Sequence, residues 1–60
     1  MERPKRYEVL DTNGDVLYQT DSWGLAVTEL ANWETHTDKG AIRELDDERG
    51  VYVIVRDNRI

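Results

Sequence analysis

Cysteine is absent from this chain of 60 residues, which also has only one proline, one histidine and four glycines. Without cysteine, disulfide bonds, thiolate metal sites and cysteine nucleophiles are all excluded. A domain of this size lies near the lower limit for independent folding, where disulfides, metals or association commonly supply the missing stability. The composition therefore favours association with another chain.

Long apolar runs and an excess of basic residues are also missing. No run approaches the roughly 18 apolar residues of a membrane helix, and the charged start of the chain is not followed by the apolar stretch of a signal peptide. We therefore expect a soluble cytoplasmic protein with no membrane contact, and a loosely ordered lead-in over residues 1–4. Eight basic and 13 acidic residues give a formal net charge of −5. Nucleic-acid binding needs many basic contacts on one face, so we expect none.

The sequence contains no pattern typical of an enzyme. His36 is the single histidine and has no evident partner, Ser22 is better placed to cap a helix, and no glycine-rich phosphate loop is present. The carboxylates of Asp46, Asp47 and Glu48 could bind a divalent ion weakly, but a hairpin tip holds ligands poorly. We predict no catalytic residue, no metal site and no cofactor.

The stretch "DTNGD" could be a calcium loop or a turn between two strands. An EF-hand loop that starts at Asp11 needs glycine at position six and an acidic residue at position twelve, whereas Gly14 stands at position four and Ser22 at position twelve. Asn-Gly is the strongest short hairpin signal, because a type I′ turn requires positive φ at both residues. We predict such a turn, and expect Asn13→Ala to destabilise the fold by about 1 kcal/mol.

This two-residue loop also sets the expected pairing of the first hairpin. Leu10 should lie opposite Leu17, and Val9 should lie opposite Tyr18, since opposed residues share a face.

The next segment has the period of an amphipathic helix. Its apolar face is formed by Trp23, Ala26, Val27, Leu30 and Trp33. Asp21 or Ser22 should cap its start, and Lys39-Gly40 should end it. The two tryptophans could form a base-stacking platform, but a helix without interleaved lysine or arginine favours a core role for both.

A second hairpin follows, with Glu48-Arg49-Gly50 as a three-residue loop. Its last strand contains the run "VYVIV", which is apolar on both faces and predicts a central strand. The chain is thus expected to form one α+β domain over residues 1–60, in the order β-hairpin, helix, β-hairpin. We predict a four-stranded, mainly antiparallel sheet with the helix packed on one face.

One helix covers one face of such a sheet and leaves the other bare. The covered face should carry Tyr7, Val9, Val16, Tyr18, Leu45, Val51, Val53 and Val55. The uncovered face should carry Leu10, Leu17, Ile42, Tyr52 and Ile54.

We predict that this uncovered face is an interaction face, which makes the chain a protein-interaction or self-assembling module. Its expected partner is a second copy in a homodimer or another protein. The alternative function is an acidic mimic of nucleic acid that inhibits a nucleic-acid-binding protein, as some phage inhibitors do. Charges of both signs at each end of the sheet favour the module, because a mimic needs an uninterrupted negative stripe.

Overall fold

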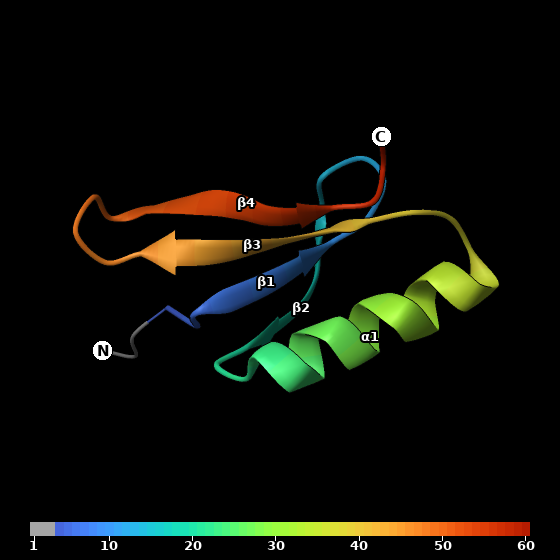
Figure 1. Ribbon diagram of the computed structural model, residues 1–60, viewed down its shortest axis with the longest axis horizontal. Helices are drawn as coiled ribbons and strands as arrows, with labels where there is room; N and C mark the ends of the chain where they lie inside the picture. Colours follow the sequence, from blue (N-terminus) through green and yellow to red (C-terminus); the bar gives the residue numbers. More distant parts are fainter. Residues whose placement is uncertain (1–3) are drawn as a thin grey trace.

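A computed structural model describes residues 4–60, and these residues form one helix and four strands (Figure 1). The elements in chain order are β1 (Tyr7–Leu10), β2 (Val16–Thr20), α1 (Trp23–His36), β3 (Ala41–Asp46) and β4 (Val51–Asp57). The predicted α+β fold of hairpin, helix and hairpin is therefore confirmed. The expected lead-in lies, except for Pro4, outside the described residues.

The strand order is β2-β1-β3-β4, and every neighbouring pair is antiparallel. The helix packs on one face, over β1, β2 and β3, and β4 lies at the edge farthest from it (Figure 1). The prediction that the "VYVIV" strand is central is wrong. Because β3 pairs with β1 from Tyr7↔Glu44 to Leu10↔Ala41, β4 is left with β3 as its single neighbour among the described strands.

The first turn is built on Asp11 and Gly14. The Asp11 carboxylate accepts hydrogen bonds from the backbone amides of Asn13 at 2.9 Å and Asp15 at 2.8 Å. The Asp11 amide in turn donates to the Asp15 carbonyl oxygen at 2.9 Å, so the loop has three residues. Gly14 has φ of 93°, whereas Asn13 does not have positive φ, and the type I′ prediction is therefore wrong.

The longer loop changes the pairing beyond Val9. Val9 lies opposite Tyr18 as predicted, but a bulge places Leu10 opposite Val16 instead of Leu17.

This geometry reverses the expected cost of substitutions in the turn. Gly14→Ala should lower the free energy of unfolding by about 1–2 kcal/mol, because a β-carbon is unfavourable at positive φ. Asn13→Ala should change it by less than about 0.5 kcal/mol. Urea denaturation followed by circular dichroism measures both. Equal losses for the two variants would contradict the three-residue loop.

The helix begins and ends on side-chain hydrogen bonds. Ser22 is the N-cap, and its hydroxyl accepts from the Leu25 amide at 3.2 Å. At the other end, the amide and the hydroxyl of Thr37 both donate to the Trp33 carbonyl oxygen, at 3.0 Å and 2.6 Å. The helix therefore ends before Lys39, and the predicted stop at Gly40 is wrong.

The second turn is one residue longer than predicted. Asp46 pairs with Val51, and the Gly50 amide donates to the Asp46 carbonyl oxygen at 2.7 Å. The Asp46 carboxylate accepts from the backbone amides of Glu48 and Arg49, which closes the turn one residue early. A one-residue shift exchanges the faces of a strand.

Two residues change faces as a result. Leu45 pairs with Tyr52, on the face away from the helix, and Ile42 shares the helix side with its partner Val9.

The core is small and lies between the helix and the sheet. Its buried cluster contains Val9, Ala26, Leu30 and Ile42, and Tyr7, Tyr18 and Val27 pack against it. Trp23 departs from the prediction, since it is 39% exposed. Its ring lies 5.4 Å from the ring of Tyr7, and the guanidinium of Arg56 lies 5.4 Å from its centre.

Candidate interaction surface

The sheet face opposite the helix is crossed by a row of polar contacts. Glu8 on β1 accepts hydrogen bonds from Gln19 on β2 at 2.5 Å and from Arg43 on β3 at 2.7 Å. The Arg43 guanidinium also lies 4.9 Å from the ring centre of Tyr52 on β4. Glu8 is only 5% exposed, and within residues 4–60 no buried side-chain polar atom lacks a partner. We call these four side chains the polar row: Glu8, Gln19, Arg43 and Tyr52.

Tyr52 closes the polar row at the β4 edge. Its hydroxyl donates to the Lys5 carbonyl oxygen at 2.7 Å. The pKa of Tyr52 is raised, and burial of the phenol is the largest cause. The negative charge of Glu8 raises this pKa further, whereas the positive charge of Arg43 lowers it. The phenol is therefore a neutral hydrogen-bond donor at physiological pH.

The structure does not bring the five predicted face residues together. Ile42 is completely buried in the core beneath the helix, so its assignment to the uncovered face is wrong, and Leu10 is buried as well. Leu17 and Ile54 are exposed, but they lie on the opposite edge strands β2 and β4. Tyr52 is half-buried and belongs to the polar row.

The exposed apolar side chains gather instead on β4. Val51, Val53 and Val55 are between 43% and 47% exposed, and Ile54 is 42% exposed. Val53 shares the helix side with its partner Glu44, whereas Ile54 shares the opposite face with its partner Arg43. The helix packs over the other three strands, and its Trp23 contacts Arg56 of β4. The apolar side chains of β4 are therefore exposed on both faces of the strand. These four side chains with Tyr52 form the β4 surface.

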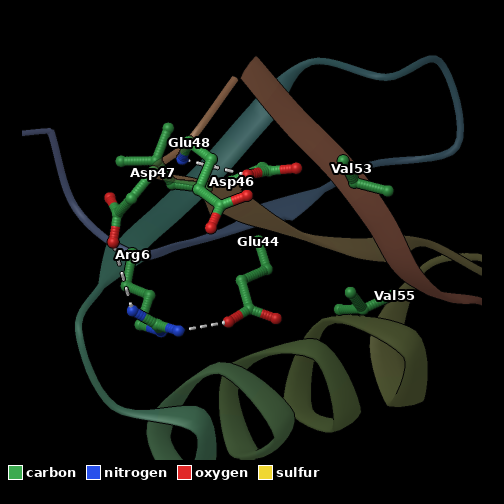
Figure 2. Close-up of a pocket in the computed structure, with 8 residues that line it drawn as sticks. Arg6, Glu44, Asp46, Asp47, Glu48, Val53 and Val55 are labelled. Atoms are coloured by element: carbon green, nitrogen blue, oxygen red, sulfur yellow. Dashed lines mark hydrogen bonds and ion pairs between the residues drawn. The ribbon is translucent and has the colours of Figure 1, made fainter. Parts of the chain in front are cut away.

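On the helix side, the β4 surface is continuous with an open hollow of about 550 Å³ (Figure 2). Val53 and Val55 line one side of it, and carboxylates of the β3–β4 hairpin line the other. Arg6 projects into this acidic group, with its Nη2 atom 2.8 Å from Glu44 and its Nη1 atom 3.8 Å from Asp47 (Figure 2).

The contacts of Arg6 balance part of this negative charge. A hydrogen bond shared with Tyr7 and the nearby carboxylate of Glu44 raise the pKa of Arg6 above its ordinary value. The hollow thus combines an apolar side with an acidic rim that Arg6 partly neutralises.

The groups considered for metal binding or catalysis have other contacts. Asp11, the first residue of the candidate calcium loop, accepts two backbone amides with one carboxylate oxygen. The Nδ1 atom of His36 lies 3.0 Å from the Asn32 carbonyl oxygen. Among residues 4–60, no three His, Cys, Asp or Glu side chains are grouped in a way that could hold a metal ion. In the same part of the chain, no helix has the length and apolar character needed to cross a membrane.

Sequence reasoning missed the exposure of β4 at the edge of the sheet. It placed Val51, Val53 and Val55 in the core, because an apolar run on both faces is typical of a central strand. The same pattern also fits an edge strand that is covered by another chain. It missed the pairing of Glu8 with Arg43 as well, although opposite charges flanked by apolar strand residues are a signal for such a contact.

Comparison with known proteins gives no match to a family model, to a curated protein or to a solved structure. The chemistry of the β4 surface is therefore the basis for the function proposed for this chain.

Proposed function

We propose that this chain is a non-enzymatic protein-interaction module that binds its partner through the β4 surface. The observation that carries the proposal is the exposure of Val51, Val53, Ile54 and Val55 along one edge strand. An edge strand offers backbone hydrogen-bond groups to an incoming strand, and contiguous exposed apolar side chains mark interaction sites. The proposed binding surface is thus the β4 edge and not the sheet face opposite the helix.

The alternative, an acidic mimic of nucleic acid, has less support. Its negative stripe would lie at the β3–β4 hairpin and the adjoining start of the helix. In that region Arg6 contacts Glu44 and Asp47, and the Lys5 ammonium lies 3.7 Å from Asp21. These cations interrupt the negative potential that such a mimic presents to its target.

Site-specific photo-crosslinking tests the module. A photoreactive residue placed at Ile54 should form covalent adducts with protein in the cells that express the chain. Leu25 is the matched control, because it is 49% exposed but lies on the helix, away from β4. We expect adducts from position 54 and few from position 25. Equal yields at both positions, or none from position 54, would remove the support for a β4 binding surface.

A further inference from the structure

We propose that the partner is a second copy of this chain, paired antiparallel with the first along β4. A two-fold axis would pass between the two facing Val53 residues, and the pairing would join the two sheets into one. This inference rests on the proposed function, since it names the occupant of the β4 surface.

The character of the two edge strands selects β4. It is seven residues long, and from Val51 to Val55 it carries five apolar residues in succession. Natural sheets protect exposed edges with lysine, proline, short strands, inward-pointing charges or β-bulges. The Val51–Ile54 stretch has none of these, and the irregularity in the pairing of β4 with β3 comes after it, at Val55. The other edge, β2, is five residues long and includes Gln19, whose side chain is held by Glu8. β4 is therefore the longer and more uniformly apolar of the two edges.

The sequence of β4 fits antiparallel pairing with itself in one register. With Val53 opposite the partner's Val53, Val51 lies opposite the partner's Val55 and Tyr52 lies opposite the partner's Ile54. Every pair in this stretch is then apolar or aromatic, which is the favourable arrangement for cross-strand neighbours.

Other registers are less favourable. A shift by one residue would oppose side chains from different faces, which the pleat does not allow. A register centred on Ile54 would place Tyr52 opposite the partner's Arg56 and Val51 opposite the partner's Asp57.

Charge favours the antiparallel direction over the parallel one. The hairpin at the start of β4 carries three carboxylates, of Asp46, Asp47 and Glu48, against one cation, Arg49. The other end carries two cations, Arg56 and Arg59, against one carboxylate, Asp57. Antiparallel pairing brings the acidic hairpin of each copy beside the partner's Arg56. Parallel pairing would place the two acidic hairpins side by side, and like charges in contact are unfavourable.

The position of the helix leaves room for this arrangement. Because α1 packs over β1, β2 and β3, it leaves β4 at the far edge of the sheet (Figure 1). The contact between Arg56 and Trp23 lies outside the Val51–Val55 stretch. In the pair, the valines of both copies would meet on the helix side of the joined sheet. Ile54 and Tyr52 of both copies would meet on the other side, next to the polar rows.

Placing opposite charges at position 53 in two separate variants tests the proposal. The 60-residue chain at tens of micromolar should sediment with twice its mass of 7.0 kDa. Val53→Lys and Val53→Glu should each be monomeric at that concentration, with dimerisation weakened at least about tenfold, because each brings two like charges face to face. An equimolar mixture of the two variants should restore the dimer, since a lysine then faces a glutamate.

Two controls make the result specific. Leu25→Lys, on the outer side of the helix, should leave the dimer intact. Far-ultraviolet circular dichroism should show both Val53 variants folded, because that side chain is 43% exposed and contributes little to the core.

Three outcomes would overturn the proposal. These are a wild-type mass of 7.0 kDa at all concentrations, single variants that remain dimeric, and a mixture that remains monomeric. If the purified chain is monomeric but crosslinking from Ile54 captures a different protein, the self-pairing is wrong and the proposed function stands. If crosslinking from that position fails as well, both are wrong.

Discussion

Arg43→Met should lower the free energy of unfolding by about 3 kcal/mol. The Nη2 atom of Arg43 lies 2.6 Å from Glu8, whose side chain is only 6% exposed. Removing the cation leaves the Glu8 carboxylate buried without its charge partner, which typically costs about 3–5 kcal/mol. The lower end of that range applies here, because the Arg43 side chain is 33% exposed and its interaction is partly screened.

The double variant Glu8→Leu/Arg43→Met should recover most of this loss. Buried ion pairs replaced by apolar residues of similar size are often neutral in stability, because the desolvation cost of both charges disappears. Arg49→Met, in the exposed second turn, is the control and should change stability by less than about 0.5 kcal/mol.

Urea denaturation of all the variants at one fixed chain concentration gives the coupling energy, and the fixed concentration removes any effect of association. A double variant that loses as much as Arg43→Met plus Glu8→Leu separately would show that the two side chains are not coupled.

Local signals in the sequence were sufficient for the elements and their order. The helix was predicted from the spacing of Ala26, Val27 and Leu30, and its cap from Ser22. Both turns were placed correctly, because Gly14 and Gly50 stand where the backbone takes positive φ. These features depend on residues that are close together along the chain.

Faces and strand order could not be predicted in the same way, because they depend on loop length and on pairing between distant residues. One additional residue in the second turn moved Leu45 to the face away from the helix. The pairing of β3 with β1, which leaves β4 at the edge, joins Val9 to Ile42 across the whole helix segment, and no short pattern specifies it. The predicted interaction face failed at Ile42 for this reason.

The edge position of β4 also changes how the composition is interpreted. The shortage of stabilising devices in a 60-residue chain favours association, and the structure offers a more apolar exposed surface at β4 than on the sheet face opposite the helix. That face holds the polar row, which satisfies its own hydrogen bonds, whereas the β4 surface exposes apolar side chains beside unpaired backbone groups. The proposed association through β4 would use both the apolar side chains and the backbone groups.

Gly40→Ala should be the most destabilising small substitution in the chain, with a loss of about 3 kcal/mol or more. A β-carbon at this position would overlap the Leu10 carbonyl oxygen and lie 2.9 Å from Cδ1 of Leu30 and 3.3 Å from Cζ3 of Trp33. The carbonyl oxygen belongs to β1, so it can move only if the strand moves. The amide of Gly40 also donates to Glu34 at 2.9 Å, and its carbonyl oxygen accepts from the Asn58 amide at 3.0 Å. The backbone is thus held in place on both sides and has no room to retreat.

Gly24→Ala provides the matched control, because the nearest atom to its new β-carbon would be the Ser22 hydroxyl oxygen at 3.8 Å. In the first turn of the helix, this change should stabilise the fold by about 0.5 kcal/mol through the better helix propensity of alanine. A domain of this size has a total stability of only about 3–9 kcal/mol, so a loss of about 3 kcal/mol removes between about a third and all of it and should lower the thermal midpoint strongly. Thermal denaturation followed by tryptophan fluorescence compares the two variants with the wild type. An unchanged midpoint for Gly40→Ala would show that β1 does not approach the start of β3 as closely as described.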